Sequence, residues 1–458
     1  MKSIFASRQD AKALKRVNLL ALLAALREIF NPMNLAPSRR LSPTMWQAGF
    51  LFGVDMVTNV ADYGFHAYLG WALTPADFAV VQTINSALLI VVTAFAVLQP
   101  VVARYAAEAG STTTGRAVNG RAIFQVYFRQ SALLGLALTL AVWLGQRPLA
   151  AWLNVPATAV ALSATMMLLA LTRPVVAGML QGQEQFVAFG ATRSAFALGR
   201  LALAVLLIGV VGGGASAGVA AIPLGGLLSL ALGLWLLGRA VWQGGPELPR
   251  LLAWQGWRLS LAAFIAYIAY MGLLNIDLIW VNRTFPADLA GSYAAAVVLR
   301  RVLAVLPGAV IVILYPRIVS RVAQGHLPDG VLAKTAAVVV VANVLVTALY
   351  FAAGPLVVRL MFGPDYPAAA ALLGWMGVAM IGYGIVTIWL NLFLATRPWA
   401  FVALLAATAV TQMALLPGAG ESLLAVTAVF GLAGWFLAAV GLVLYRFWLR
   451  PRLRTTGD

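Results

Sequence analysis

The segment TAAVVVVANVLVTALYFAAGP, Thr335–Pro355, contains no charged residue and only a few polar ones. A helix needs about 20 apolar residues to cross the hydrocarbon core of a bilayer, and this segment has that length. Lys334 stands directly before it and Arg359 shortly after it, so charged residues bound the apolar run on both sides. The segment therefore predicts a membrane-spanning helix.

Segments of the same kind fill most of the chain. The twelve predicted spans are 45–72, 79–102, 124–145, 156–180, 194–213, 216–242, 259–282, 290–316, 335–355, 368–394, 399–417 and 422–448. Hydrophobic residues make up 62% of the 458 residues and charged residues only 10%, whereas a soluble domain carries about 25% charged residues. The sequence thus predicts an all-α polytopic membrane protein with about twelve transmembrane helices.

The positions of lysine and arginine predict how the chain is threaded. With the N-terminus in the cytoplasm, 23 of the 31 basic residues fall in the head, the tail and the inner loops. Only Arg147, Arg283 and Arg359 fall in outer loops, and five arginines lie inside spans. Because cytoplasmic loops are enriched in lysine and arginine, we expect a multi-pass protein of the cytoplasmic (inner or plasma) membrane with both termini in the cytoplasm.

The same pattern divides the chain into five parts. They are a basic cytoplasmic head (1–43), an N-terminal six-helix lobe (44–242), a cytoplasmic linker (243–258), a C-terminal six-helix lobe (259–448) and a basic cytoplasmic tail (449–458). Within the head, residues Lys12–Phe30 combine a short apolar stretch with Lys15, Arg16 and Arg27. This predicts an amphipathic helix on the anionic inner leaflet; a signal peptide is the competing interpretation, but no small-residue cleavage site follows.

Two short motifs recur at one constant offset. Pro75-Ala76-Asp77 matches Pro286-Ala287-Asp288, and Pro156-Ala157 matches Pro367-Ala368, each 211 residues later. The matches are short, so coincidence is the alternative. If the repeat is real, each half has six spans and both halves insert with the same orientation. Such parallel repeats place a binding cavity between the halves, near the membrane midplane.

Four polar residues of the first span are spaced 4, 3 and 4 residues apart: Asp55, Asn59, Asp62 and His66. This spacing puts them on one helix face. A charge at the centre of a spanning helix costs about 2.5–3.5 kcal/mol, so the stripe must face protein or water. Two interpretations stay open: the stripe lines an aqueous cavity, or it forms a structural seam with a neighbouring helix.

The seventh span carries a second polar pair, Asn275 and Asp277, toward its outer end. Asp277 lies 211 residues after His66, which is the offset of the repeat. Both halves are therefore predicted to carry an ionisable group at one equivalent place, where it lines the cavity or takes part in ion coupling.

Four arginines lie deeper in the spans: Arg173, Arg200, Arg300 and Arg301. A guanidinium group holds phosphate through two parallel charge-assisted hydrogen bonds, so a cavity with unpaired arginine favours an anionic headgroup. Adjacent helical residues point about 100° apart, so at most one of Arg300 and Arg301 aims straight into a cavity. Arg173 and Arg200 alternatively extend their charged ends to the cytoplasmic interface.

Several other functions are disfavoured. The chain has no cysteine and only two histidines, His66 and His326, so no metal site and no cofactor are expected. The net charge of +17 lies in inner loops rather than on a soluble basic face, so no nucleic-acid partner is expected. A phosphate-binding loop of the Gly-x-x-x-x-Gly-Lys-Ser/Thr type is missing, and the predicted loops are too short for a catalytic domain. The chain is therefore not expected to be an enzyme.

Several stretches resemble the polysaccharide transporter family of lipid-linked oligosaccharide flippases. This family belongs to the multidrug/oligosaccharidyl-lipid/polysaccharide exporter superfamily, which also contains the multidrug and toxin extruders. The similar stretches are YLGWALTPADFAVVQTINSALL (Tyr68–Leu89), LQPVVARYAAE (Leu98–Glu108), LQGQEQFVAFG (Leu180–Gly190), Tyr315-Pro316-Arg317 and RLMFGPDYPAAAALL (Arg359–Leu373). The resemblance covers about residues 44–448, while the long basic head departs from the family's short N-terminus. It rests on many short patterns, and it assigns no cavity residue by itself.

The resemblance and the charges lead to one expected function. The protein is expected to flip a polyprenyl-pyrophosphate-linked oligosaccharide by alternating access, for export of polysaccharide, lipopolysaccharide or another cell-envelope glycan. The four deep arginines would bind the pyrophosphate, and Asp55, Asp62 or Asp277 would couple transport to protons or sodium. Membrane lipids, a glycan polymerase and glycosyltransferases are the expected partners. A cation-coupled multidrug extruder and a membrane-bound enzyme of glycan assembly are the alternatives.

Overall fold

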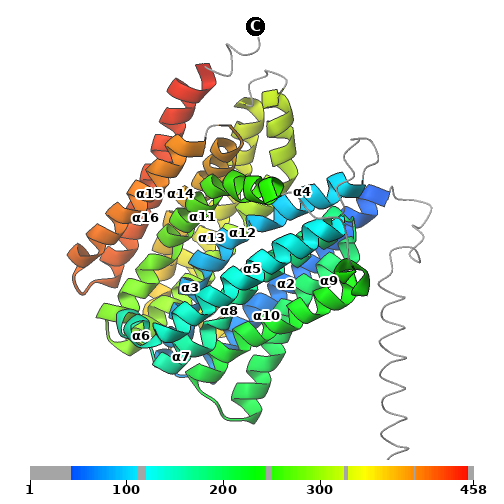
Figure 1. The fold of residues 1–458 in the computed structure, drawn as a ribbon. Helices are drawn as coiled ribbons and strands as arrows, with labels where there is room; N and C mark the ends of the chain where they lie inside the picture. The colour runs from blue at the N-terminus through cyan, green and yellow to red at the C-terminus, as the bar shows by residue number, and fades with distance from the viewer. Residues whose placement is uncertain (1–42, 111–119, 244–249, 324–328, 397, 452–458) are drawn as a thin grey trace, which may run out of the picture.

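The computed structural model describes residues 43–110, 120–243, 250–323, 329–396 and 398–451. Regular structure in these ranges is entirely helical (Figure 1). The predicted interfacial helix of the head, within Lys12–Phe30, lies outside the described residues, as do residues 452–458 of the predicted tail.

The helices fall into two groups along the chain. The first contains α2 (Pro43–Ala72), α3 (Pro75–Phe95), α4 (Leu98–Gly110), α5 (Gly120–Leu144), α6 (Gln146–Leu153), α7 (Ala157–Ser163), α8 (Thr165–Gly182), α9 (Phe186–Ala204), η2 (Val205–Val210), α10 (Ala215–Leu237) and η3 (Arg239–Trp242). The second contains α11 (Arg250–Thr284), α12 (Ala287–Ala323), α13 (Asp329–Phe362), α14 (Pro367–Thr396), α15 (Pro398–Leu415), η4 (Leu416–Ala419), α16 (Leu423–Leu444) and η5 (Tyr445–Leu449). We call them the N-lobe and the C-lobe.

Hydropathy predicted these helices well but placed several of their ends too far inward. Ten spans of the described chain are long and apolar enough to cross a membrane. The two other predicted spans are α2 and α12, which are 30 and 37 residues long and carry most of the predicted polar site. α11 begins at Arg250, so the second half of the predicted linker is helical. A helix continues past the apolar core of a span because charged residues also adopt helical backbone in water.

One helix illustrates the match between sequence and membrane. On α13, Val341, Leu345 and Leu349 are spaced four residues apart and are 52–66% exposed. Asn343 and Thr347 lie on the opposite face and are buried. An apolar stripe that faces outward and polar residues that face inward are what a lipid environment requires. With the ten candidate spans, this pattern makes the chain a multi-pass membrane protein.

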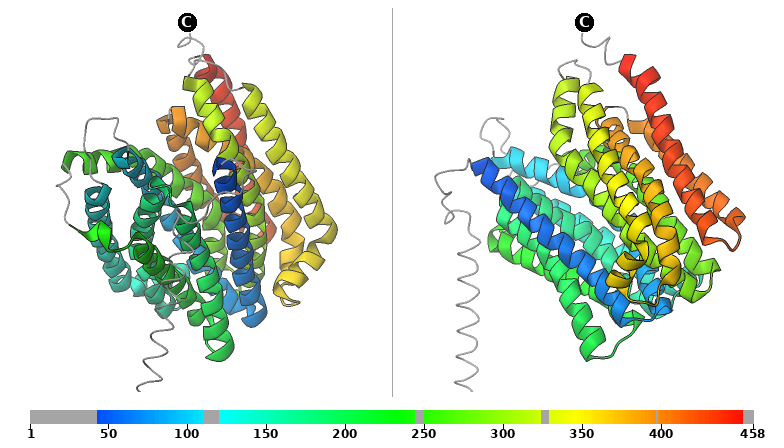
Figure 2. Two further views of the ribbon diagram at one scale, coloured as in Figure 1. Left: turned by 90° about the vertical axis from the view of Figure 1, so that its right-hand side faces the viewer. Right: turned by 180° about the vertical axis from the view of Figure 1, so that it is seen from behind.

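The two lobes lie side by side, and their helix axes diverge toward the end of the bundle that carries the C-terminus (Figure 2). We call this the Leu449 end. At the opposite end α2 turns into α3, α11 into α12 and α13 into α14; we call it the Pro75 end. The residues of the turn before α3 determine where this helix begins. The Thr74 hydroxyl accepts a hydrogen bond from the Asp77 amide, and Pro75 occupies the first helical turn.

At the Pro75 end the lobes are in direct contact. The ring of Phe78 lies 5.5 Å from those of Phe362 and Tyr366, and the Tyr366 hydroxyl donates to the carbonyl oxygen of Gly70 (3.1 Å). Burial, and then the nearby Asp365 carboxylate, raise the pKa of Tyr366, so its hydroxyl stays protonated and remains a donor. On α12, residues 290–300 are buried throughout. The lobes are therefore closed against each other at this end.

Two asparagines add a polar contact to the closed end. Asn282 Nδ2 donates to the carbonyl oxygens of Leu153 (2.9 Å) and Asn154 (3.1 Å), and Asn154 Nδ2 donates to the carbonyl oxygen of Asn282 (2.8 Å). Each of these bonds joins one lobe to the other. Side-chain hydrogen bonds to backbone carbonyls across an interface fix its register as well as its stability.

We expect Asn282→Ala to weaken closure at the Pro75 end, because it leaves the carbonyl oxygens of Leu153 and Asn154 without this donor. The expected loss is about 1–3 kcal/mol, which is an increase of roughly 5- to 150-fold in the open population. The measurement is maleimide labelling of a single cysteine at Ala295, which is fully buried, in this otherwise cysteine-free chain. Asn391→Ala is the control, because Asn391 bonds only within its own helix, to Thr387; equal labelling of both variants would refute the role of Asn282.

Candidate inter-lobe site and side pockets

The polar stripe of α2 lies on one face, as predicted, and pairs with arginines of α9. Asp62 forms an ion pair with Arg200, and Asp55 lies 2.7 Å from Arg193 Nη1. In both pairs the arginine lies 138 residues after the aspartate. The separation is the same because α2 and α9 run in the same direction. The side chains of Asp55 and Asp62 are 42% and 43% exposed. The stripe therefore combines the two interpretations: it is a seam with a neighbouring helix whose carboxylates still reach an accessible surface.

The remaining members of the stripe behave differently from the carboxylates. His66 is buried, and its Nδ1 lies 2.8 Å from Nε2 of Gln82 on α3. Asn59 is half-buried, on the same face of α2 between Asp55 and Asp62. The stripe thus changes from accessible to buried as α2 approaches the Pro75 end.

In the C-lobe, Asp277 and Arg300 form a closed polar cluster. Arg300 Nη1 pairs with Asp277 Oδ2, and Nη2 donates to Asp277 Oδ1 (2.8 Å) and to the carbonyl oxygen of Leu274 (2.6 Å). The Tyr293 hydroxyl donates to Asp277 (2.6 Å), and the Phe430 ring covers the guanidinium at 4.0 Å. The two charged side chains are 1% and 0% exposed. Arg300 is already paired with a carboxylate. An anionic substrate would have to displace Asp277 before it could bind this arginine.

Arg301 is placed between the lobes. Its Nη2 donates to Ser86 Oγ of α3 (2.8 Å) and to Asn275 Oδ1 of α11 (3.0 Å), while Nη1 is buried without a hydrogen-bond partner. Arg301 and Asp62 both lie close enough to Tyr63 to act on it electrostatically. In the described residues no carboxylate lies within ion-pairing distance of Arg301. We call Asp62, Ser86, Asn275 and Arg301 the inter-lobe site.

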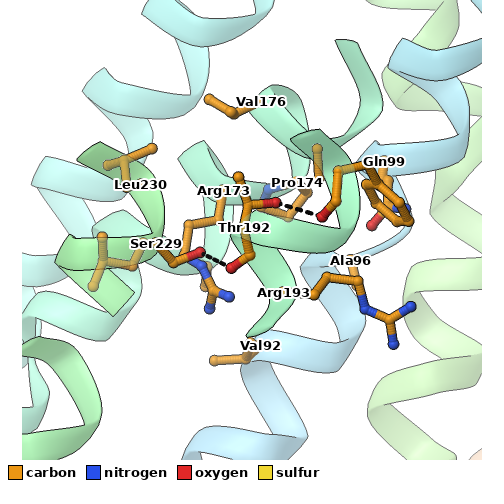
Figure 3. Close-up of a pocket in the computed structure, with 14 residues that line it drawn as sticks. Val92, Ala96, Gln99, Arg173, Pro174, Val176, Thr192, Arg193, Ser229 and Leu230 are labelled. Atoms are coloured by element: carbon orange, nitrogen blue, oxygen red, sulfur yellow. Dashed lines mark hydrogen bonds between the residues drawn. The ribbon is translucent and has the colours of Figure 1, made fainter. Parts of the chain in front are cut away.

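Arg173 lies elsewhere, in a pocket of about 200 Å³ inside the N-lobe. Helices α3, α4, α8, α9 and α10 enclose it, and Figure 3 shows Arg173 and Arg193 among its polar lining with Thr192, Ser229 and Gln99. The Arg173 guanidinium stacks over Phe196 at 4.1 Å. Of the four arginines predicted to bind substrate, the structure therefore places Arg301 at the inter-lobe site, Arg200 and Arg300 in ion pairs, and Arg173 in a separate pocket.

The C-lobe contains a larger, apolar pocket of about 440 Å³ between α13, α14 and α16. Ile385, Trp389 and Leu442 are part of its lining. At its border, Asp329 accepts from Tyr445 and pairs with Arg450 at 2.5 Å. This pocket carries no unpaired charge of its own among the residues that line it.

Sequence reasoning missed Arg193 and Ser86 as members of these sites. Arg193 was assigned to an inner loop, but α9 begins at Phe186 and carries Arg193 two turns inside the helix. A signal for its role was present, because Arg193 and Arg200 are seven residues apart, as are Asp55 and Asp62. Ser86 gives no such signal, since its contact depends on how the lobes meet.

Comparison with known proteins identifies the fold. No family model matches the chain, and no curated protein does so either. Among solved structures, the lipid II flippase MurJ in an inward closed conformation is similar with a TM-score of 0.69 and 10% identity, over 89% of this chain and 90% of that one. An inward-facing multidrug resistance MATE family transporter of the MOP superfamily gives 0.66 and 13% identity, over 87% and 94%. A MOP superfamily transporter from Pyrococcus furiosus, described by the reverse polarity of its binding pocket, gives 0.55 and 13%, over 89% and 94%.

The chain therefore has the helical fold shared by MATE transporters and MurJ. At 10–13% identity the likeness establishes the fold and leaves the substrate open. The names of these neighbours include both a lipid II flippase and multidrug resistance transporters.

Proposed function

We propose that this protein is a flippase for a lipid whose headgroup carries a pyrophosphate, in particular a polyprenyl-pyrophosphate-linked oligosaccharide. One observation carries the proposal: within the described residues, Arg301 stands between the lobes, holds only neutral partners, and keeps one terminal nitrogen without a hydrogen bond. A guanidinium group in this state can exchange Ser86 and Asn275 for phosphate oxygens, which bind it more strongly because they are charged.

The charges around Arg301 favour an anion over a cation. The three aspartates predicted to lie within the membrane, Asp55, Asp62 and Asp277, each have an arginine partner. An organic cation would have to displace one of these arginines, whereas a phosphate meets an arginine that no carboxylate holds. Binding of the anion therefore needs no ion pair to break.

Asp62 and Arg200 offer a route for coupling to a proton gradient. Asp62 is 43% exposed, whereas Arg200 is only 5% exposed. A proton bound at Asp62 would change the net charge beside Arg301, and the ion pair with Arg200 would form again when the proton leaves. Asp277 is unsuited to this role because it is fully buried in its pair with Arg300. If sodium is the coupling ion instead of the proton, it would bind at the exposed carboxylates of Asp55 and Asp62.

In the proposed cycle the two lobes rock about the inter-lobe site. The distribution of lysine and arginine places the Leu449 end in the cytoplasm, so the headgroup enters there while the Pro75 end is closed. Opening of the Pro75 end then releases it to the outer leaflet, with the lipid tail left in the bilayer. Glycosyltransferases that build the glycan and a polymerase that extends it are the proposed partners in the membrane.

We expect Arg301→Gln to reduce transport of a fluorescent polyprenyl-diphosphate glycan at least tenfold. The protein is reconstituted in vesicles, and lipid that reaches the outer leaflet is measured by accessibility to a lectin. Arg301→Lys keeps the charge without the planar fork, so an intermediate rate is expected. Arg147→Gln removes an exposed arginine far from the site and serves as the control; equal rates for R301Q and R147Q, at equal amounts of folded protein, would overturn the proposal.

A cation-coupled multidrug extruder is the second candidate, because Asp55 and Asp62 are accessible and MATE transporters share the fold. It predicts that Asp62→Asn abolishes export of an organic dye such as ethidium while R301Q leaves export unchanged. A membrane-bound enzyme of glycan assembly, the third candidate, predicts turnover of a glycan substrate by the purified protein alone.

A further inference from the structure

The N-lobe pocket contains a charge that its surroundings do not balance. Arg173 has no carboxylate within ion-pairing distance in the described part of the chain, and its Nε is sealed from solvent without a hydrogen-bond partner. Arg173 is half-buried, and an uncompensated charge that is largely removed from water is costly, so it persists in a protein where something else satisfies it.

The neighbouring groups increase this imbalance. The Phe196 ring lies under both Arg173, at 4.1 Å, and Arg200, at 5.2 Å, so two guanidinium groups share one aromatic ring. Arg200 acts on Arg173 electrostatically as a like charge. The two acids of this region, Asp55 and Asp62, are already paired with Arg193 and Arg200. Three arginines and two aspartates leave one positive charge in excess, and it resides on Arg173.

The pocket has the lining and size of an anion site. Arg173 and Arg193 supply charged donors, Gln99 an amide, and none of the lining residues is acidic. Its volume of about 200 Å³ equals the share of roughly six or seven water molecules in the liquid. That space admits a group of five heavy atoms, such as phosphate, together with a few waters. A polyatomic oxyanion presents several acceptor oxygens, so it can accept from Arg173 and from a second donor of the lining at once, which a single halide ion does less well.

We propose that the Arg173 pocket binds a phosphate-class oxyanion, either as free inorganic phosphate or as the headgroup of an acidic phospholipid. The site is separate from the inter-lobe site and does not depend on what the protein transports. Because Arg193 contacts both this pocket and Asp55 of α2, an anion here draws Arg193 away from the α2 stripe.

The test uses the full chain, purified in detergent and depleted of lipid, with inorganic phosphate as the probe. Thermal unfolding is followed as phosphate is raised, with sodium chloride keeping the ionic strength constant. We expect phosphate to raise the midpoint of unfolding in the unchanged protein and in R147Q. In R173Q the concentration needed for the same rise is expected to be at least tenfold higher.

A second arm distinguishes the two sources of phosphate. The same proteins are placed in vesicles of phosphatidylcholine with or without phosphatidic acid. Stabilisation by phosphatidic acid alone, lost in R173Q, assigns the site to a lipid headgroup; stabilisation by inorganic phosphate assigns it to the free ion. Equal responses of R173Q and R147Q in both arms, or no response of the unchanged protein in either, overturn the proposal. If R173Q does not fold, R173K takes its place, with a smaller but still measurable loss of affinity expected.

Discussion

Replacing Asp277 with alanine is expected to lower the free energy of unfolding by about 3–5 kcal/mol, because it leaves the Arg300 charge buried and unpaired. Arg300 is 1% exposed, and the Phe430 ring covers the face of its guanidinium group. Its other hydrogen bond goes to the carbonyl oxygen of Leu274, and Tyr293 bonds Asp277 from the other side. Most domains have a total stability of about 5–15 kcal/mol, so this loss is large. Thermal unfolding of the purified variant measures it, together with the yield of folded protein.

Two comparisons show whether the loss comes from the unpaired charge. Asp55→Ala breaks an ion pair whose arginine, Arg193, and carboxylate are 46% and 42% exposed, so water can screen the arginine that remains and a loss of about 1 kcal/mol is expected. The double variant D277L/R300M replaces the pair with apolar side chains of similar volume and should recover most of the stability. If D277A and D55A cost the same, or the double variant is no better than D277A, the buried charge is not the cause.

The fold could be predicted from the sequence because the bilayer imposes a strong pattern. Each predicted span falls on a helix or on two consecutive helices of the described chain, even where charges interrupt the apolar run, as in α2 and α12. The errors lie at the ends: Arg193 was assigned to a loop although α9 begins at Phe186. Hydropathy shows where the chain enters and leaves the lipid. It does not show where a helix ends when the polar residues beyond the apolar run are also helical.

The ion pairs of the N-lobe could also have been predicted. Asp55 and Asp62 are seven residues apart on one helix, and Arg193 and Arg200 are seven apart on another that runs in the same direction. Parallel helices keep a constant offset, so one pair predicts the other. The partners of Arg301 could not be predicted in this way. Its contacts to Ser86 and Asn275 come from two different lobes, and their distance depends on the state of the whole bundle.

One observation bears on the internal repeat. Gln82 hydrogen-bonds His66 in the N-lobe, and Tyr293 hydrogen-bonds Asp277 in the C-lobe. Both members of the second pair lie 211 residues after those of the first, which is the offset of the Pro-Ala-Asp motifs. A polar pair at equivalent places in both halves supports common ancestry of the lobes. The two pairs differ in chemistry: an imidazole meets an amide in the N-lobe, and a carboxylate meets a phenol in the C-lobe.

Gly291→Ala is the second change for which we expect a large effect, and it acts on the closed end itself. A methyl group at Gly291 would lie 2.6 Å from the carbonyl carbon of Pro75, so the first turns of α12 and α3 could not keep their distance. The obstacle is backbone, which cannot rotate away as a side chain can. Overpacking of this kind costs up to about 3 kcal/mol, which lowers the ratio of closed to open states by about 100-fold.

Maleimide labelling of a cysteine at Ala295, one turn further along the same face of α12, measures this change. We expect about 100-fold faster labelling in the G291A background and a conformation open at the Pro75 end. Gly272→Ala is the matched control, because no atom lies within 4 Å of its added methyl group and alanine favours helix over glycine. Slow labelling in both backgrounds would show that the lobes do not separate between α3 and α12, and alternating access would then need a different moving interface.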